Sequence, residues 1–239
     1  MRIDLSTPIL ARNEALASEN RHRLASHGVF VLDVLASPGA GKTTTILATI
    51  AALRDRYRIA VIEGDVASKV DAEKVKSHGI PAVQINTGGA CHLEADMISR
   101  ALDALPLDDL DLVIVENVGN LVCPTEFDLG HSSRIVVASV PEGHDKPLKY
   151  PGIFAQADAI LLNKCDTTSV FDFDEGEFRE AVARLNGAAP IFTMSAKTGE
   201  GVGEWASWLA DRIQAARAAG GGDPATGAAD EEPASGGRS

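Results

Sequence analysis

The hydrophobic pattern of this chain alternates between two kinds of segment. Short runs such as Leu112–Val115 are apolar at every position and indicate strands covered on both faces. Longer segments that begin or end at capping residues, such as Thr7-Pro8 and Gly28, separate them and indicate helices. The expected strands are 30–35, 58–62, 82–86, 112–115, 134–140, 159–163 and 190–194. The expected helices are 7–26, 43–53, 72–78, 93–105, 175–185 and 203–217.

Strands that alternate with helices predict an α/β fold, with a mostly parallel sheet and helices on both of its faces. We expect residues 1–28 to form an N-terminal helix packed on the domain, and residues 29–217 to form the main domain. Residues 218–239 are rich in Gly, Ala, Pro, Ser and acidic residues. Such a segment buries too little apolar surface to offset its ordering entropy, so we expect a disordered tail.

Charge and composition exclude several classes of partner. The 239 residues include 34 acidic and 22 basic side chains, for a net charge of −12. This balance argues against binding to nucleic acid or to an anionic membrane surface. The N-terminus lacks the pattern of a signal peptide, and no apolar run approaches the roughly 20 residues of a membrane span. Three cysteines do not suggest a disulfide framework, so we expect a cytoplasmic protein.

The segment Ala36–Thr43 (ASPGAGKT) matches a phosphate-binding loop of the form A/G-x-x-x-x-G-K-T, between an expected strand and an expected helix. Small residues let backbone N–H groups close around phosphate oxygens, and the helix adds its N-terminal dipole. Lys42 is expected to reach the β- and γ-phosphates, and the Thr43 hydroxyl to bind Mg²⁺. The expected nucleotide-binding residues of this loop are Gly39, Ala40, Gly41, Lys42, Thr43 and Thr44.

A second motif indicates which base is bound. Residues 163–166 (NKCD) follow an expected strand and have the N-K-x-D spacing of GTPases. The Asp166 carboxylate can accept hydrogen bonds from N1–H and N2–H₂ of guanine, a donor pair that adenine lacks. The aliphatic part of Lys164 is expected to lie over the base. Asn163 is expected to brace the phosphate loop and its neighbours.

A third motif, Ser195-Ala196-Lys197, follows the next expected strand and matches the second guanine-contact loop of GTPases. In that loop the backbone N–H of Ala196 would meet O6 of guanine. The three motifs occur in the order that GTPases require, so together they predict a P-loop protein that binds GTP and GDP and hydrolyses GTP.

Two further loops carry carboxylates near the expected phosphate site. Asp65 is a candidate ligand for Mg²⁺ or for water, with an ordinary turn aspartate as the alternative. Glu116 stands where most GTPases have the aspartate of D-x-x-G, and is expected to hold Mg²⁺ through water. The N–H of Gly119 is expected to bond the γ-phosphate. Asn120 replaces the water-positioning glutamine, so we expect slow hydrolysis. The candidate catalytic residues are Lys42, Asp65, Glu116 and Gly119.

Cysteine and histidine residues occur in two loops that follow expected strands. Cys91 and His92 are adjacent, just before the helix expected from Leu93, and Cys123 lies four residues beyond Gly119. A cysteine at a helix N-terminus has a lowered pKa, which favours metal binding. Thiolate and imidazole suit Ni²⁺ and Zn²⁺, although three ligands are one short of a closed shell. Residue types alone leave open a purely structural role for the trio.

Several longer segments resemble the HypB family, the SIMIBI-class GTPases that incorporate nickel during [NiFe]-hydrogenase maturation. The resemblance spans roughly residues 10–215, which makes 29–217 the GTPase domain. The most specific segments are 116–124 (ENVGNLVCP) and 145–151 (DKPLKYP). The other matching segments are 37–44, 63–65, 91–93 and 163–164.

The resemblance implies a GTP-dependent homodimer with a Ni²⁺ or Zn²⁺ site built from Cys91, His92 and Cys123 near the dimer interface. It implies that Lys149 reaches the nucleotide of the partner subunit. The implied partners are a nickel-handling protein and the precursor of the hydrogenase large subunit, into which nickel is inserted. The N-terminal cysteine motif and the His-rich stretch of some members are absent, which favours transfer of metal over storage.

Two alternatives stay open at the level of the sequence. The first is a urease-type nickel accessory GTPase, whose C-P-H metal motif differs from Cys91-His92 with a separate Cys123-Pro124. The second is a regulatory GTPase whose nucleotide state controls a binding partner, with a structural zinc site. Metal analysis of the purified protein distinguishes the second from the nickel-handling alternatives.

Overall fold

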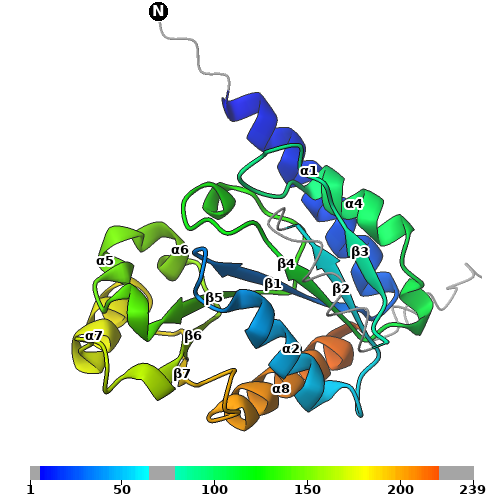
Figure 1. Cartoon of the computed structure of the whole chain (residues 1–239). Coiled ribbons are helices and arrows are strands. Elements are labelled where there is room, and N and C mark those ends of the chain that lie inside the picture. Colours follow the sequence, from blue (N-terminus) through cyan, green and yellow to red (C-terminus); the bar gives the residue numbers. More distant parts are fainter. Residues whose placement is uncertain (1–5, 65–78, 221–239) are drawn as a thin grey trace, which may run out of the picture.

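A computed structural model describes residues 6–64 and 79–220. The helix expected at 72–78, the candidate ligand Asp65 and most of the C-terminal tail lie outside the described residues. The seven described strands form one parallel sheet in the order β3-β2-β4-β1-β5-β6-β7 (Figure 1), which confirms the expected fold class. The strands are β1 Phe30–Ala36, β2 Ile59–Glu63, β3 Ala82–Gln84, β4 Leu112–Glu116, β5 Ser133–Ser139, β6 Ala159–Asn163 and β7 Ile191–Thr193.

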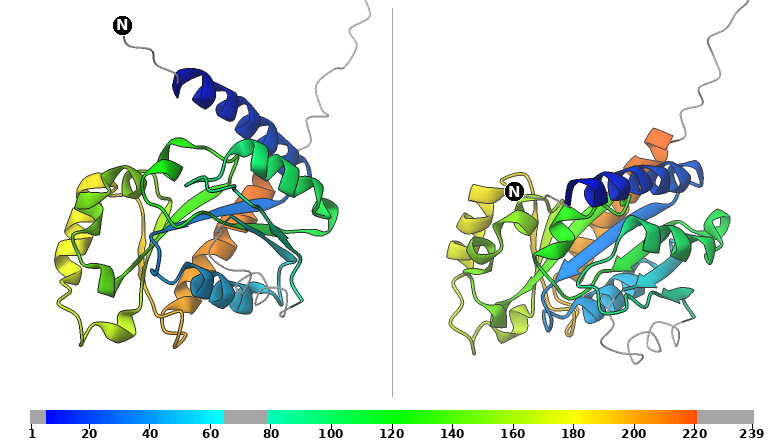
Figure 2. Two further views of the ribbon diagram at one scale, coloured as in Figure 1. Left: turned by 45° about the horizontal axis from the view of Figure 1, so that its top comes forward. Right: turned by 90° about the horizontal axis from the view of Figure 1, so that it is seen from above.

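Helices cover both faces of this sheet. The described α-helices are α1 Ser6–Ser26, α2 Lys42–Leu53, α4 Ala95–Asp103, α5 Lys146–Lys149, α6 Pro151–Ala155, α7 Glu175–Leu185 and α8 Val202–Gly220. Short 3₁₀ turns occupy Leu107–Asp109, Cys123–Glu126, Val140–Glu142 and Cys165–Thr167. Helices α2 and α8 lie on one face, whereas α1, α4, α6 and α7 lie on the other (Figures 1 and 2). The sequence did not predict α5 and α6, because each is about one turn long and has a proline at its start.

The helix expected from Leu93 begins two residues later, at Ala95. Leu93 is fully buried in the core between β2 and α4. Its side chain fills the space beside Gly64, where an added Cβ would lie 2.5 Å from Leu93 Cδ1. Leu93 is therefore held by tertiary packing in an extended loop, although its apolar character fits the helical pattern.

The core consists of one apolar cluster on the α2–α8 face and two on the opposite face. Strand β1 contributes alternate residues to the two faces, as the two-residue period of a strand requires. Phe30, Leu32 and Val34 point toward α2 and α8, whereas Val31 joins the cluster under α1 and α4. Leu35 joins the third cluster, under α6 and α7. Residue 33 points to the same face as Val31 and Leu35, and lies between them where the second and third clusters meet.

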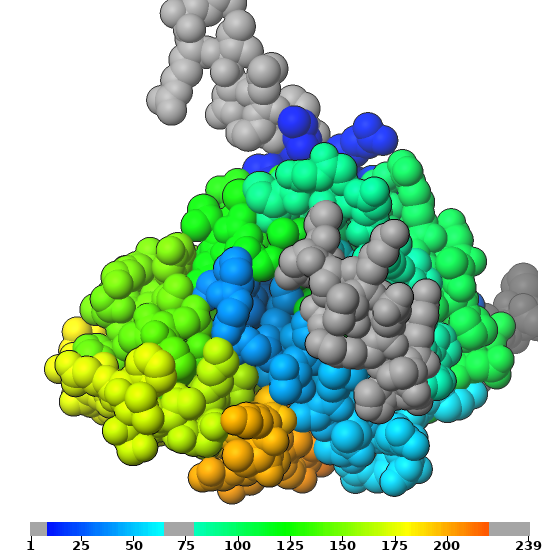
Figure 3. All heavy atoms as spheres, viewed as in Figure 1, coloured from blue at the N-terminus to red at the C-terminus, as the bar shows by residue number. Residues whose placement is uncertain are grey.

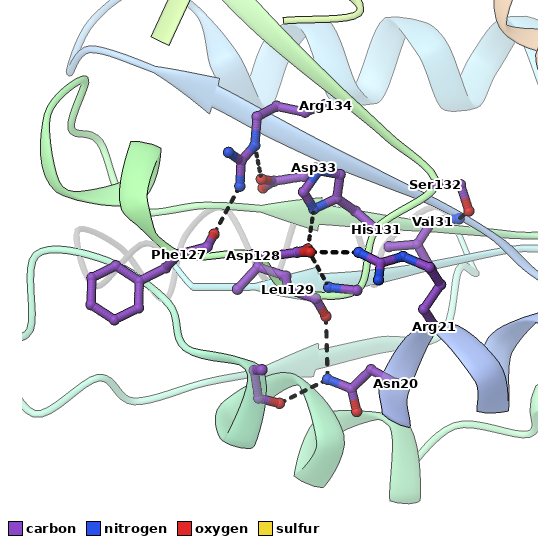
Figure 4. Close-up of polar contacts among 12 residues, drawn as sticks. Asn20, Arg21, Val31, Asp33, Phe127, Asp128, Leu129, His131, Ser132 and Arg134 are labelled. Carbon is purple, nitrogen blue, oxygen red and sulfur yellow. Dashed lines mark hydrogen bonds and ion pairs between the residues drawn. The ribbon is translucent and has the colours of Figure 1, made fainter. Parts of the chain in front are cut away.

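A buried ion pair occupies this junction. Asp33 of β1 lies opposite Arg134 of β5 in the strand register, and Arg134 Nε donates to Asp33 Oδ2 at 3.0 Å (Figure 4). The Asp33 side chain is fully buried and that of Arg134 is 6% exposed. Arg134 Nη2 also donates to the carbonyl of Phe127 at 2.8 Å, and Asn117 Nδ2 donates to Asp33 Oδ1 at 3.0 Å. The pair therefore fixes the two loops that run over this end of β1.

Asparagine side chains of helix α1 connect the start of α4 to the loop at 128–130. Asn13 Nδ2 donates to the carbonyl of Asp128 at 2.7 Å, and Asn13 Oδ1 accepts from the N–H of Ala95 at 2.8 Å. Asn20 donates to the carbonyls of Ala95 and Leu129, at 2.9 and 3.2 Å (Figure 4). The start of α4 and the loop at 128–130 are thus held together by α1. No helix among the described residues is long and apolar enough to cross a membrane.

At the amino-terminal ends of the strands, Asp111, which precedes β4, connects the start of β2 to the end of α8. Arg58 donates to it through Nη2 at 2.9 Å and through its backbone N–H at 2.7 Å, and Arg217 Nη2 donates as well. Burial by itself raises the pKa of Asp111, but these hydrogen bonds from Arg58 and Arg217 outweigh burial and lower the pKa from 3.8 to about 2. The ionised form is therefore favoured in the folded protein.

Replacing Asp111 with asparagine is expected to lower the free energy of unfolding at pH 7 by about 1–2 kcal/mol, since the exposed arginines weaken the interaction. Because the folded pKa lies below the unfolded value, the contribution of Asp111 is complete above about pH 4 and is lost as the pH falls through 2. The wild type and Asp111→Asn should therefore converge in acid. Urea unfolding followed by tryptophan fluorescence measures this. The control, Asp55→Asn at an exposed position, should change stability by less than about 0.5 kcal/mol.

Candidate nucleotide and metal site

The phosphate-binding motif forms the loop between β1 and α2, at the carboxyl end of the central strand. Gly39 and Gly41 have φ angles of 83° and 97°, which L side chains rarely adopt. A Cβ at Gly41 would also lie 2.5 Å from Asn163 Nδ2. In the space-filling view the blue segment around residue 40 is open at the surface, beside the yellow-green segment around residue 165 (Figure 3). The loop is thus shaped to receive a ligand from solvent.

The polar side chains at the start of α2 face the loop that follows β4. Lys42 is 6% exposed, and its Nζ donates to the carbonyl of Asn117 at 2.5 Å and lies 4.0 Å from Glu116 Oε1. Thr43 Oγ1 donates to Glu116 Oε1 at 2.7 Å. A hydroxyl and a buried carboxylate side by side offer the hard oxygen ligands that Mg²⁺ prefers, so Thr43 and Glu116 could hold this ion.

Residues of the two guanine motifs lie on the other side of the phosphate loop, after β6 and β7. Asn163 Nδ2 donates to the carbonyl of Ala40 at 3.0 Å, so Asn163 braces the phosphate loop as expected. Lys164 has a left-handed backbone, and its Nζ donates to the carbonyl of Gly39 at 2.6 Å. Its side chain therefore lies against the loop. Asp166 is exposed, as a reader of a base would be.

The N–H of Ala196, which the sequence predicts to meet guanine O6, already has a hydrogen-bond partner within the protein. It donates to Asn163 Oδ1 at 3.0 Å. Guanine O6 would therefore have to share or displace this hydrogen bond. Ser195 is fully buried and its Oγ accepts from the N–H of Thr198 at 3.2 Å, which shapes the turn, whereas Lys197 and Thr44 are exposed.

The structure brings Cys91, His92 and Cys123 together, with one ligand atom of each within 4.8 Å of the others. Cys123 lies at the start of the 3₁₀ turn after β4, and the other two lie in the loop after β3. Because α4 starts at Ala95, Cys91 does not lie at a helix N-terminus, and the expected lowering of its pKa is wrong. A hydrogen bond with Cys123, aided by burial, instead raises the pKa of Cys91. The Cys123 thiol thus favours the neutral form of Cys91.

Two asparagines connect the loop after β4 to the Cys91-His92 loop. Asn117 is 1% exposed, and its Oδ1 accepts from the N–H of Leu93 at 3.4 Å. Asn120 Nδ2 donates to the carbonyl of Cys91 at 3.1 Å. The segment 116–123 thus contacts Lys42 at one end, contacts the residues on both sides of His92, and supplies Cys123 at its other end.

Comparison with known proteins identifies the family to which this chain belongs. The model of the CobW/HypB/UreG nucleotide-binding domain matches residues 30–193. The hydrogenase maturation factor HypB of Azotobacter chroococcum is 45% identical over 215 residues, covering 90% of this chain and 70% of that protein. The structure of HypB from Helicobacter pylori in complex with nickel superimposes with a TM-score of 0.81 at 41% identity, covering 85% of this chain and 96% of that one. The chain belongs to the HypB family.

The HypB-family resemblance noted from the sequence is therefore confirmed, as is the P-loop fold. A second relative carries a broader name: the hydrogenase/urease maturation factor HypB of Helicobacter pylori is 42% identical over 208 residues, covering 85% of each protein. The match to the family model includes the phosphate loop, the Cys/His trio and Asn163, and ends two residues before Ser195.

In this HypB-family protein, Lys149 lies on α5 and is 60% exposed, with its Nζ 2.6 Å from Asp145 Oδ2. Helix α5 is connected to the phosphate loop by Glu142, which the sequence did not single out. The Glu142 carboxylate accepts from Ser37 Oγ of that loop, and its Oε1 lies 3.2 Å from Lys146 Nζ of α5. Glu142 thus links the phosphate loop to the helix that carries Lys149.

Several other important residues were not identified from the sequence. Asp33 carried a signal, because it is the one charged residue in the apolar run of β1. Arg134 and Phe127 become significant only through the strand register and the stacking of Phe127 on His92, with ring centroids 3.8 Å apart. Asn117 lies inside a recognised motif, but only its contacts show that it connects the two sites.

Proposed function

We propose that this protein is a GTP-hydrolysing nickel metallochaperone, in which the nucleotide state controls a metal site at a dimer interface. Membership of the HypB family and the likeness to a nickel complex support the nickel cargo. The N-K-x-D motif, with Asn163 bonded to the phosphate loop and Asp166 exposed, supports GTP as the nucleotide. The recipient we propose is the large subunit of a [NiFe]-hydrogenase, supplied through a nickel-handling partner.

One observation carries the proposal: the segment 116–123 contacts Lys42 of the phosphate loop and also carries Cys123, which lies beside Cys91 and His92. The Lys42 ammonium is bonded to the carbonyl of Asn117. The β- and γ-phosphates of GTP would compete for this ammonium. An ammonium forms a stronger hydrogen bond with a charged phosphate oxygen than with a neutral carbonyl oxygen. Asn117 would then be released toward a new position, and its hydrogen bond to Leu93 would carry the change toward His92. Cys123 belongs to the same segment and would move with it.

The residues of the phosphate site suit slow hydrolysis rather than rapid turnover. Thr43 and Glu116 would hold Mg²⁺, which when bound neutralises charge that develops on the phosphates. Gly119 would donate its N–H to the γ-phosphate. Asn120 occupies the place of a water-positioning glutamine, but its amide is hydrogen-bonded to the carbonyl of Cys91. Its side chain therefore serves the metal loop and is not available to orient water.

The metal site suits cargo in transit. Two thiols and one imidazole are ligands that bind Ni²⁺ and Zn²⁺, but three ligands do not close a tetrahedral or square-planar shell. Cys91 is exposed, so a second copy of the chain or a recipient could supply the missing ligand. Lys149 is exposed on α5 and could reach the nucleotide of that second copy. A site completed only by dimerisation would release metal when the dimer opens.

Nickel affinity measured with a bound GTP analogue and with GDP tests the control of the metal site. We expect the two states of the wild type to differ by about tenfold or more, a coupling of about 1–3 kcal/mol. Cys123→Ala should bind Ni²⁺ weakly and equally in both states, because it lacks the ligand that moves with the segment. Cys165→Ala removes the one other thiol of the chain and should behave as the wild type. Equal affinity of the wild type in both states would contradict the proposal.

The name of the Helicobacter relative covers hydrogenase and urease, so the recipient needs its own measurement. Cells that lack the protein should lose nickel from hydrogenase while urease retains its nickel. The reverse result would favour the urease-type function. Stoichiometric zinc that does not exchange with nickel would favour the regulatory GTPase with a structural site.

A further inference from the structure

The His92 ring lies in a defined orientation between the thiols and a carboxylate. Its Nδ1 is 3.6 Å from Cys91 Sγ, on the side of the cysteine pair. Its Nε2 is 3.6 Å from Glu94 Oε1. This Nε2 atom is buried and makes no hydrogen bond within the described residues. The two ring nitrogens thus face chemically different groups, one soft and one anionic.

The ring is also held from its face. Phe127 stacks on His92 with a centroid separation of 3.8 Å and an interplanar angle of 25°. The carbonyl of Phe127 accepts from Arg134 Nη2 at 2.8 Å, and Arg134 is in turn fixed by the buried Asp33. This stacking restricts the imidazole to one plane. The interchange of Nδ1 and Nε2 by rotation of the ring is therefore hindered before any metal binds.

Among residues 6–64 and 79–220, the Glu94 side chain has no polar contact other than the one with His92. It occupies the N-cap position of α4, but its side chain makes no capping hydrogen bond. The N–H of Ala95, at the first turn of that helix, is satisfied by Asn13 Oδ1 of α1 at 2.8 Å. The glutamate side chain is 41% exposed and can adjust its position. A distance of 3.6 Å is too long for a hydrogen bond, and a small rotation of this side chain closes it.

We propose that His92 binds the metal ion through Nδ1, and that Glu94 is a positioning residue that accepts the Nε2–H. The inference rests on the proposed metal site and specifies its chemistry. A metal-binding histidine usually donates its other ring N–H to a carboxylate or carbonyl, which fixes the tautomer and makes the bound nitrogen more basic. The helix does not compete for the Glu94 carboxylate, because the N–H of Met97, which an N-cap side chain could accept, donates to the backbone carbonyl of Glu94 at 3.0 Å.

The bound nitrogen can be identified directly with the full-length protein labelled with ¹⁵N-histidine. Zn²⁺ is the probe, because it is diamagnetic and suits the same ligands. Long-range ¹H–¹⁵N spectra are expected to show His92 with a metal-bound Nδ1 and a protonated Nε2. A metal-bound Nε2, or no change at His92 when Zn²⁺ is added, would overturn the inference.

A variant series measures the contribution of Glu94 to nickel binding. Glu94→Ala is expected to weaken Ni²⁺ affinity by about 10–100-fold, the usual effect of removing such a partner. Glu94→Gln keeps a carbonyl acceptor and should recover part of the loss. Glu126→Gln removes the same charge from the exposed end of the 3₁₀ turn that begins at Cys123, and should change affinity by less than about threefold. Equal losses in Glu94→Ala and Glu126→Gln would reduce Glu94 to a general electrostatic role and overturn its assignment.

These outcomes separate the inference from the proposed function. If the wild type binds Ni²⁺ equally with GTP analogue and GDP, while Nδ1 is metal-bound and Glu94→Ala loses affinity, the nucleotide control fails and the inference stands. If Ni²⁺ affinity follows the nucleotide but Nε2 is the metal-bound nitrogen, the proposed function stands and the inference fails. Absence of any metal binding by the wild type would overturn both.

Discussion

Replacing Lys42 with alanine is expected to lower the rate of GTP hydrolysis by about 10²–10³-fold, which is typical for removing one preorganised group that stabilises transition-state charge. Lys42 is buried at the base of the phosphate loop and its Nζ is already bonded to the carbonyl of Asn117. Because the ammonium is aimed before GTP arrives, little reorganisation is needed when charge develops on the phosphates. Single-turnover phosphate release at saturating GTP measures this effect.

A matched control comes from the same helix. Arg54 lies at the C-terminal end of α2 and is exposed, so Arg54→Ala should hydrolyse GTP at the wild-type rate. Circular dichroism should show that both variants are folded. Lys42→Ala should also lose the nucleotide dependence of nickel affinity, since the contact between the phosphate site and segment 116–123 is removed. Hydrolysis by Lys42→Ala within about threefold of wild type would contradict the assignment of this loop.

Replacing Arg134 with methionine is expected to lower the free energy of unfolding by about 3–5 kcal/mol, the cost of leaving a buried charge without its partner. Asp33 is fully buried and Arg134 Nε is its cationic partner. The carbonyl of Phe127 would lose a donor in the same variant. Chemical unfolding followed by the fluorescence of Trp205 and Trp208 provides the measurement.

An exposed ion pair provides the comparison for this variant. Arg184 and Glu180 pair at 3.1 Å on the surface of α7, with side-chain exposures of 72% and 73%. Arg184→Met should cost less than about 1 kcal/mol, because water screens such pairs. The double variant Asp33→Leu/Arg134→Met should recover part of the loss, since no uncompensated charge remains. A loss in Arg134→Met no larger than that in Arg184→Met would show that water or local rearrangement satisfies Asp33.

The strands were predictable because their runs are short and mostly apolar without helical periodicity, which is typical of parallel strands buried on both faces. The boundary of α4 was not predictable, since Leu93 fits a helical pattern but packs against Gly64 from a loop. The short helices α5 and α6 were hidden by prolines that, in isolation, indicate turns. Local sequence thus specified the sheet, whereas tertiary contacts decided where some helices begin.

The candidate site was predictable to the extent that its motifs are local in sequence. The phosphate loop and the N-K-x-D motif each act through adjacent residues. In contrast, the roles of Asp33, Phe127 and Glu94 depend on partners brought near by the fold. Their side chains are of common types and follow no spacing rule. The raised pKa of Cys91 has the same origin, because the Cys123 thiol that causes it lies in another loop.

The order of the strands has a further consequence for how this protein could diversify. The loops with the metal ligands follow β3 and β4, on one side of β1, whereas the loops of the two guanine motifs follow β6 and β7, on the other side. In the proposed function, cargo preference and base preference would thus be carried by separate halves of the sheet. Each half can accumulate substitutions without disturbing the other, provided that the phosphate loop between them is retained. In such a modular architecture, a change in metal selectivity would not require a change in nucleotide selectivity.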